Sequence, residues 1–228
     1  MKKAALIVGG GSGVRMGNTL PKQFLELEGM PMIMRSARVF AETFSDIRLI
    51  VVLPAGQLAL WEELVHRYRF TYPVELVAGG NTRFHSVKNG VGLVRRHEIV
   101  AVHDAARPVI SCELIRRCFR LAEEKGSAVP VMVPVDSIRE ITAEGHIPVN
   151  RDNYRLVQTP QVFRGDFLIE AYDTEYQPLY TDDAVVVEEA GFAIFLITGE
   201  RTNIKVTYPE DFRLAAWMIK QAGKGEKP

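Results

Sequence analysis

Five glycines and two basic residues stand close together near the start of the chain, in a pattern suited to binding phosphate. An apolar run over residues 4–8 ends abruptly in the loop that holds these glycines: Gly9, Gly10, Gly11, Gly13 and Gly17. Arg15 lies inside this loop, and Lys22 follows it. Glycine lets successive backbone N–H groups come close to a ligand and form an anion-binding nest. The stretch therefore predicts a nucleoside triphosphate site directly after a buried strand.

The loop fits neither of two common phosphate-binding patterns. The dinucleotide fingerprint G-x-G-x-x-G would need glycine where the chain has Val14 or Met16, depending on the starting position. The P-loop pattern G-x-x-x-x-G-K-[ST] does not match either. A dinucleotide-binding oxidoreductase is therefore a disfavoured alternative, which binding of NAD(P)H would test.

A second candidate for chemistry is Asp104, which ends another apolar run. Mg²⁺ takes only one or two protein carboxylates and completes its shell with phosphate oxygens and water. An acidic residue at the end of a strand that faces the phosphate loop is therefore a candidate magnesium ligand, the alternative being a carboxylate at a helix N-terminus. Ala105 and Ala106 are small enough to let a nucleotide approach. His103 is expected to be structural, because no cluster of metal ligands surrounds it.

Other polar residues later in the chain have weaker patterns. Arg151 and Lys205 could contact a substrate or could be solvated charges. Residues 181–183, Thr-Asp-Asp, could supply an acidic ligand, but a helix N-cap is the favoured interpretation.

The elements that must position these residues alternate between strand and helix. Strands are expected at residues 4–8, 47–53, 74–77, 99–102, 128–133 and 192–197, and helices at 31–43, 58–69, 86–94, 111–125, 167–172, 183–190 and 209–221. This order predicts an α/β fold with a Rossmann-like, mostly parallel sheet and helices on both faces. The loops that follow the strands should then meet at one edge of the sheet, where ligands bind in such folds.

The alternation breaks at residues 135–158, where the pattern is strand, turn, strand. We expect a protruding β-hairpin arm there. This arm either mediates dimerisation or is a plain surface hairpin. The whole chain, 1–228, is otherwise expected to form a single domain.

Composition narrows the function classes. Of 228 residues, 28 are Lys or Arg and 28 are Asp or Glu, and this balance argues against a nucleic-acid partner. No apolar stretch approaches the roughly 18 residues of a membrane span, and the first apolar run is too short for a signal peptide. Cys112 and Cys118 fit no zinc or redox spacing, which favours reduced thiols in a cytoplasmic protein.

No Ser-His-Asp set or activated cysteine stands out in the sequence. Nucleotidyl transfer to a phosphomonoester needs neither, because the acceptor phosphate is already ionised near neutral pH. Catalysis of that reaction is positioning plus charge stabilisation by Lys, Arg and Mg²⁺.

Seven motifs, in order along nearly the whole chain, resemble the cytidylyltransferases that act on 2-C-methyl-D-erythritol 4-phosphate in the non-mevalonate isoprenoid pathway. They are G-x-G-x-R-M (11–16), P-K-Q (21–23), G-G-x-x-R (79–83) with Ser86, H-D-A-A-R-P (103–108), R-x₇-T-P-Q (151–161), T-D-D-A (181–184) and N-I-K-V-T (203–207). The resemblance implies that CTP and a polyol phosphate are the substrates and that Mg²⁺, or another divalent cation, is the cofactor.

The resemblance also implies a role for each matching residue. Catalytic roles fall to Arg15, Lys22, Arg151 and Lys205, and Asp104 would hold Mg²⁺. The nucleotide-binding set is Gly9, Gly10, Gly11, Ser12, Gly13, Gly80, Asn81, Ser86, Ala105 and Ala106. The acceptor-binding set is Arg107, Ser137, Arg151, Thr159 and Lys205. In this family the arm crosses to the partner subunit, so a homodimer with shared active sites is implied.

Three departures from the family's usual pattern keep alternatives open. Gly9 and Gly10 replace alanines, Asn81 replaces an aspartate, and Ser137-Ile138-Arg139 replaces Thr-x-Lys. The last change touches the acceptor pocket. Ribitol-5-phosphate cytidylyltransferase, which shares several motifs, is therefore the close rival, although H-D-A-A-R-P and T-D-D-A favour the methylerythritol enzyme. A non-catalytic nucleotide-binding regulator is disfavoured because the full set of cations is retained.

Overall fold

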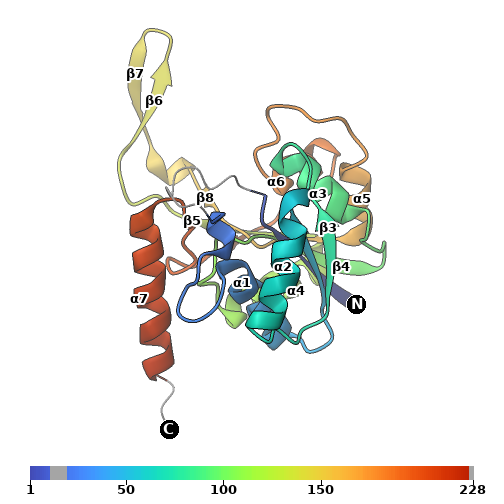
Figure 1. The fold of residues 1–228 in the computed structure, drawn as a ribbon. Coiled ribbons are helices and arrows are strands. Elements are labelled where there is room, and N and C mark those ends of the chain that lie inside the picture. The colour runs from blue at the N-terminus through green and yellow to red at the C-terminus, as the bar shows by residue number, and fades with distance from the viewer. Residues whose placement is uncertain (11–19, 226–228) are drawn as a thin grey trace.

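The computed structural model describes residues 1–10 and 20–225, which form a twisted central sheet covered by helices (Figure 1). The strands of the sheet are β1 (Lys2–Val8), β2 (Arg48–Leu53), β3 (Val74–Ala78), β4 (Glu98–Asp104), β5 (Ser127–Met132), β8 (Leu156–Val157), β9 (Gln161–Arg164) and β10 (Leu196–Thr198). Their order is β10-β5-β9-β4-β1-β2-β3, with β8 paired to β5. Among these described strands, only β8 and β9 run antiparallel to their neighbours, so the expected mostly parallel sheet is confirmed.

Helices cover both faces of the sheet, as the alternation predicts. They are α1 (Met32–Thr43), α2 (Leu58–Arg67), α3 (Arg83–Val91), α4 (Cys112–Lys125), α5 (Gly165–Ala171), α6 (Asp183–Glu189) and α7 (Pro209–Gly225), with 3-10 turns at Lys22–Phe24, Ala55–Gln57 and Arg151–Asn153. Successive side chains of a strand point to opposite faces. Ala5 and Ile7 of β1 accordingly pack with α1, α2 and α4, whereas Leu6 and Val8 pack with α3, α5 and α6.

Several elements differ from the sequence expectation. Strand β10 covers only Leu196–Thr198, and β8, at the end of the segment expected to form the arm, pairs with β5 of the main sheet. Helix α3 begins at Arg83 rather than at residue 86, because the Thr82 side chain caps it by accepting a hydrogen bond from the His85 N–H (3.3 Å). The early start brings Arg83 to the carboxyl edge of the sheet. Strand β9 was not expected, yet it lies inside the sheet and pairs antiparallel with both β4 and β5. The helix expected at 111–125 is confirmed as α4, and the Ser111 side chain caps it by accepting a hydrogen bond from the Leu114 N–H (3.0 Å).

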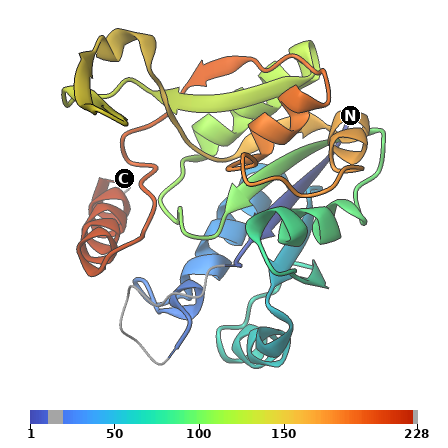
Figure 2. The same ribbon diagram turned by 90° about the horizontal axis from the view of Figure 1, so that it is seen from above.

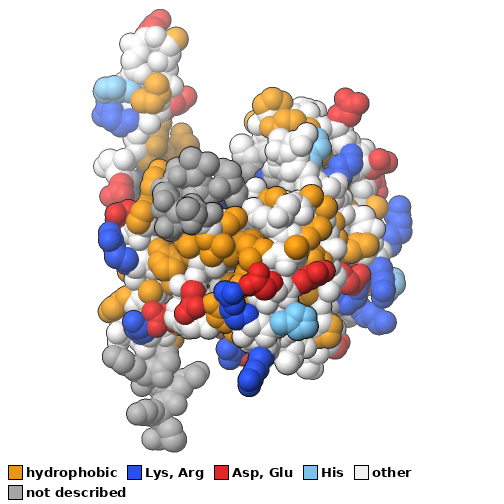
Figure 3. All heavy atoms as spheres, in the orientation of Figure 1, with side chains coloured by type: hydrophobic (Ala, Val, Ile, Leu, Met, Phe, Trp, Pro, Cys, Tyr) orange, Lys and Arg blue, Asp and Glu red, His pale blue; other side chains and the backbone are white. Residues whose placement is uncertain are grey.

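A two-stranded hairpin projects from the domain, as expected for residues 135–158. Its strands, β6 (Ile138–Thr142) and β7 (Gly145–Val149), form a separate sheet by pairing with each other. Figures 1 and 2 show this arm on the same side of the molecule as α7. Ile141 and Ile147 on the arm are 79% and 49% exposed, and Figure 3 shows further hydrophobic side chains below the arm. Among the described residues, no helix has the length and apolar character needed to cross a bilayer.

Candidate active site

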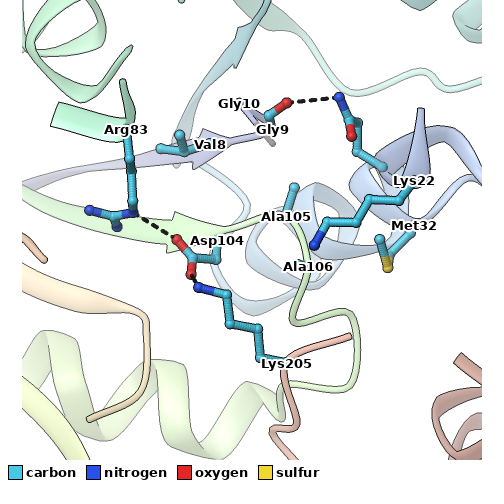
Figure 4. Close-up of a pocket in the computed structure, with 11 residues that line it drawn as sticks. Val8, Gly9, Gly10, Lys22, Met32, Arg83, Asp104, Ala105, Ala106 and Lys205 are labelled. Atoms are coloured by element: carbon cyan, nitrogen blue, oxygen red, sulfur yellow. Dashed lines mark hydrogen bonds and ion pairs between the residues drawn. The ribbon is translucent and has the colours of Figure 1, made fainter. Parts of the chain in front are cut away.

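A cavity of about 210 Å³ opens at the carboxyl edge of β1 and β4 (Figure 4). The ends of the two strands are in register, since Val8 pairs with Asp104 and the Ala105 N–H donates to the Val8 carbonyl (3.0 Å). The lining residues are Val8, Gly9, Gly10, Lys22, Gln23, Met32, Arg83, Asp104, Ala105, Ala106 and Lys205. The residues that follow β1 and β4 therefore meet here, as expected for the ends of parallel strands.

A second cavity, of about 190 Å³, adjoins the first on the side of β9. Its lining residues are Arg83, Asp104, Arg107, Val157, Gln158, Thr159, Gln161, Thr181, Asp182 and Lys205. Three residues line both cavities: Arg83, Asp104 and Lys205. We call these three residues the charge row, because they place one anion between two cations at the boundary of two adjoining spaces.

Asp104 is held on both of its carboxylate oxygens. Oδ1 accepts a hydrogen bond from Arg83 Nε (3.1 Å), and Oδ2 pairs with Lys205 Nζ (2.7 Å). Burial acts to raise the pKa of Asp104, but the charges of Arg83 and Lys205 hold it far below the usual range of a carboxyl group. Asp104 is therefore a carboxylate at any physiological pH.

The first cavity, at the carboxyl ends of β1 and β4, is bordered by backbone that packs closely against the core. A Cβ atom on Gly9 would lie 2.8 Å from Leu53 Cδ2 and 2.9 Å from Ile33 Cδ1, so the chain here runs directly against the core. Gln23 donates from Nε2 to the Gly9 carbonyl (2.9 Å), which joins the P-K-Q segment to the start of the glycine loop. Gly9, where the family usually has alanine, is thus packed closely against the core.

Lys22 lines the first cavity and belongs to the 3-10 turn Lys22–Phe24. Its ammonium group donates to the Val206 carbonyl (3.1 Å), which lies next to Lys205 in the chain. The P-K-Q and N-I-K-V-T motifs, 184 positions apart, are therefore in contact. Four expected site residues, Gly11, Ser12, Gly13 and Arg15, lie outside the described residues.

The turn after β3 and the first turn of α3 hold three of the residues expected to bind the nucleotide. The Ser86 hydroxyl accepts from the Gly80 N–H (3.1 Å) and donates to the Thr82 carbonyl (2.9 Å), so this side chain shapes the turn. Gly80 and Asn81 are exposed. The turn lies beside the glycine loop, because a Cβ atom on Gly10 would be 3.3 Å from Ser86 Oγ. Neither cavity is lined by Gly80, Asn81 or Ser86.

The second cavity contains two residues expected to bind the acceptor. Arg107 donates to the carbonyls of Asn203 (2.7 Å) and Val157 (3.4 Å), while its buried Nε–H has no partner among the described residues. The Thr159 hydroxyl accepts from the Asp104 N–H (3.1 Å) and contacts His103 Nδ1 (3.2 Å). Thr159 is thus tied to the backbone of Asp104, and the cation of Arg107 faces a polar space.

His103 has the structural role that the sequence analysis expected. It is fully buried, and its two ring nitrogens contact the Arg107 carbonyl (3.1 Å) and the Thr159 hydroxyl (3.2 Å). Burial lowers its pKa to about 4. A neutral ring can donate from Nε2 to the Arg107 carbonyl and accept at Nδ1 from the Thr159 hydroxyl. The imidazole, the carbonyl and the hydroxyl then all have hydrogen-bond partners.

The arm residues lie apart from both cavities of their own chain. Ser137 and Arg151 are exposed, and neither lines a cavity. Arg151 donates to the carbonyl of Val135 at the foot of the arm. Within one subunit, the structure therefore does not bring these two expected acceptor-binding residues to the site.

Sequence reasoning did not assign a role to Arg83, the central new residue of the site. The only signal was its place in the G-G-x-x-R motif, in a strand-to-helix turn. Its guanidinium lies between two carboxylates, Asp104 and Asp183. Burial acts to lower the pKa of Arg83, but these two carboxylates raise it well above its usual value. In the T-D-D-A motif, Asp182 is the N-cap of α6, as favoured, whereas Asp183 is an ion-pair partner.

The donor set at the charge row fits a magnesium ion bound together with phosphate. Asp104 supplies a single buried carboxylate that lines both cavities, and Mg²⁺ needs only one or two of these. Within the described residues, no group of three or more His, Cys, Asp or Glu side chains could form an all-protein metal site. Oδ2 faces Lys205, whose side chain is 49% exposed and so has room to move.

Comparisons with known proteins agree with the motif set. Residues 3–221 match the family model described as 2-C-methyl-D-erythritol 4-phosphate cytidylyltransferase. Proteins of that name from Bacteroides fragilis and Porphyromonas gingivalis are 44% and 45% identical over 219 residues, covering 96% of this chain and 100% and 98% of theirs. The crystal structure of the Thermus thermophilus protein of that name, 30% identical, superposes with a TM-score of 0.75 and covers 96% of this chain and 100% of its own.

Proposed function

This chain belongs to the 2-C-methyl-D-erythritol 4-phosphate cytidylyltransferase family, and from that premise we propose how it joins CTP to 2-C-methyl-D-erythritol 4-phosphate. The observation that carries the proposal is the pair of adjoining cavities that share Arg83, Asp104 and Lys205. CTP occupies the cavity at the glycine loop, and the acceptor phosphate occupies the cavity at Arg107. The products are 4-(cytidine 5′-diphospho)-2-C-methyl-D-erythritol and pyrophosphate.

The reaction is a direct displacement at the α-phosphorus of CTP. An anionic oxygen of the acceptor phosphate forms a new bond to this phosphorus. The bond from the α-phosphorus to the oxygen that bridges it to the β-phosphorus breaks, and pyrophosphate leaves with that electron pair. No general base is needed, because the acceptor phosphate is largely ionised near pH 7. The protein's task is to hold two anions in line and to offset their charge.

The cations of the site divide that task. Lys22 lines the cavity of the triphosphate, where charge builds up on the leaving pyrophosphate. Arg107, whose buried Nε–H lacks a partner in the described part of the chain, offers a donor to the acceptor phosphate. Lys205 lies at the boundary, where the attacking oxygen meets the α-phosphorus. Arg15, expected to act beside Lys22, completes the set from outside the described residues.

Asp104 would hold the magnesium ion. When bound, Mg²⁺ neutralises part of the charge of the triphosphate and so favours attack by an anion. The role of this chain is to present a carboxylate that stays ionised, since Arg83 and Lys205 keep the pKa of Asp104 low.

Pyrophosphate release with a panel of substrates tests the proposed reaction. CTP with 2-C-methyl-D-erythritol 4-phosphate should release pyrophosphate, and CTP with ribitol 5-phosphate should be much slower. The opposite ranking would assign the chain to the rival acceptor, which the Ser137-Ile138-Arg139 departure keeps open. UTP and ATP with the preferred acceptor measure selection of the base.

We propose that the chain works as a homodimer in which the arm, residues 135–158, reaches the partner's site. Support comes from the arm itself, whose Ile141 and Ile147 are exposed and whose Arg151 lines neither cavity of its own subunit. A sedimentation measurement at micromolar concentration should give a dimer. Mixing inactive Asp104→Asn and Arg151→Ala proteins should restore activity, because a mixed dimer has one intact site. A monomer, or no restoration, would refute the shared site.

We also propose a cytoplasmic location, because the free thiols Cys112 and Cys118 are typical of a protein in a reducing compartment. Recovery of the native protein in the cytoplasmic fraction of its own cells is the direct check.

A further inference from the structure

Arg83 is bonded to carboxylates through all three of its guanidinium nitrogens. Nη1 and Nη2 donate to the two oxygens of Asp183 (2.9 and 2.7 Å), and Nε donates to Asp104 Oδ1 (3.1 Å). A planar guanidinium can satisfy such a fork on one side and a third acceptor on the other, whereas a lysine ammonium cannot. The plane of Arg83 is therefore set by two carboxylates of the protein itself.

The far side of Arg83 is anchored in the core. Asp183 is fully buried and accepts a further hydrogen bond from the Tyr172 hydroxyl (2.6 Å). Phe84, the next residue of α3, is stacked between Tyr172 and Tyr180, with ring centroids 5.1 and 5.4 Å apart. The anchor therefore joins the start of α3 to the segment between α5 and α6.

The two cations on Asp104 differ in freedom of movement. Arg83 is fixed by Asp183, whereas Lys205 holds Oδ2 through a side chain that is half exposed. A fixed partner on Oδ1 restricts rotation of the carboxylate and leaves Oδ2 as the oxygen that can exchange partners. Lys205 can leave Oδ2, but Arg83 cannot leave Oδ1 without disturbing its fork on the buried charge of Asp183.

We propose that Arg83 is a positioning residue for the cytidylyl transfer: anchored by Asp183 and Tyr172, it fixes Asp104 so that Oδ2 is presented to the divalent cation at the boundary of the two cavities. This inference rests on the proposed metal-binding role of Asp104. Arg83 acts through Asp104 rather than on the reacting phosphates.

A matched ion pair at the other edge of the sheet provides the control. Arg48 also lies between two carboxylates, with Nη1 on Glu98 (2.6 and 2.8 Å) and Nε and Nη2 on Glu75 (2.9 and 2.7 Å). Glu98 is the first residue of β4 and Asp104 the last, so the two clusters share one strand. Arg83→Lys and Arg48→Lys therefore each remove a guanidinium that bridges two carboxylates, one at the cavities and one away from them.

The experiment measures Mn²⁺ affinity by electron paramagnetic resonance in the presence of CTP without acceptor, together with kcat, KM for CTP and thermal unfolding. Arg83→Lys should weaken Mn²⁺ binding and lower kcat by about tenfold or more, the usual effect of losing an outer-shell partner. The KM for CTP should change less than kcat. Arg48→Lys should lower the unfolding temperature but change Mn²⁺ affinity and kcat by less than about twofold.

Two milder variants keep the test meaningful if Arg83→Lys folds poorly. Tyr172→Phe removes one hydrogen bond to Asp183 and leaves the ring stack, so a several-fold loss in Mn²⁺ affinity is expected. Asp183→Asn, which weakens the anchor more, should fall between the two. Folded variants with wild-type Mn²⁺ affinity and kcat would overturn the proposal. A wild-type enzyme that turns over but shows no Mn²⁺ binding with CTP would instead overturn the metal-binding role of Asp104.

Discussion

Strand β4 carries a buried carboxylate at each end, and the two ends show how one kind of ion pair serves two purposes. At the amino end, the oxygens of Glu98 accept from Arg48 (2.6 and 2.8 Å) and from the Arg95 N–H (2.9 Å). Neither Glu98 nor Arg48 lines the cavities at the charge row. Arg48 is the first residue of β2 and Glu98 the first of β4, so this cluster stabilises the amino ends of the strands.

At the carboxyl end, Asp104 pairs with two basic side chains, Arg83 and Lys205; Lys205 is half exposed, and two cavities adjoin this cluster. The difference is not in charge but in what the ion pair faces. Glu98 is fully buried against the protein, whereas Asp104 faces space that a substrate can fill. A buried carboxylate with Arg partners is therefore a sign of function only where a cavity and a movable partner accompany it.

Neutralising each carboxylate tests this contrast with the largest expected effects. Asp104→Asn should lower kcat by about 10³-fold, because the charge that balances the triphosphate-bound cation is lost. Glu98→Gln should leave kcat nearly unchanged and lower the free energy of unfolding by about 3 kcal/mol, as expected when one partner of a buried pair is removed. Steady-state kinetics and urea unfolding of both variants provide the comparison. Equal losses of kcat would show that the two ends do not differ in function.

The second test compares lysines at the two edges of the sheet. Lys22→Ala should lower kcat by about 10²-fold or more, since a cation at the triphosphate stabilises charge that develops in the transition state. Lys3 pairs with Glu123 (3.0 Å) at the opposite edge, and Lys3→Ala should leave turnover unchanged. Near-normal turnover of Lys22→Ala would mean that its ammonium group has a structural role, such as holding the Val206 carbonyl, and none in catalysis.

The carboxyl edge was predictable from the sequence because its parts are local. Short apolar runs that end in Gly9 or Asp104 predict buried strands, and a parallel sheet brings the carboxyl ends of such strands together. The hairpin at 135–158 was equally local, since its two strands flank a short turn. The helix predicted at 111–125 shows the same, because its start depends on Ser111 and the residues that follow it.

What sequence reasoning missed depends on distant partners. Arg83 is defined by Asp104 and Asp183, which are 21 and 100 positions away, so its motif gave no hint of a fork between two carboxylates. Strand β9 is four residues long, and it exists because the chain returns from the arm into the gap between β4 and β5. The separation of Ser137 and Arg151 from the cavities likewise follows from the direction of the arm, which local patterns do not fix.

The smallest effect that we predict is on the pH dependence of the unfolding free energy. It comes from His103, near the carboxyl end of β4. Burial lowers the pKa of His103 to about 4, from the value near 6.5 that it has in the unfolded chain. Between these values the unfolded state binds a proton that the folded state does not, so stability falls as the pH falls. From pH 6.5 to 5 this should amount to about 1.5 kcal/mol, as the linkage relation gives.

His103→Gln should therefore flatten the pH dependence of the unfolding free energy over that window, whatever constant offset it adds. Glutamine can still donate to the Arg107 carbonyl, which keeps part of the local bonding. Urea unfolding at several pH values, with a chelator present, measures the slope. A wild-type slope in His103→Gln would mean that His103 takes up its proton in the folded protein. The carboxyl end of β4 would then hold a charged imidazolium beside Asp104, instead of a neutral imidazole hydrogen-bonded to Thr159 and Arg107.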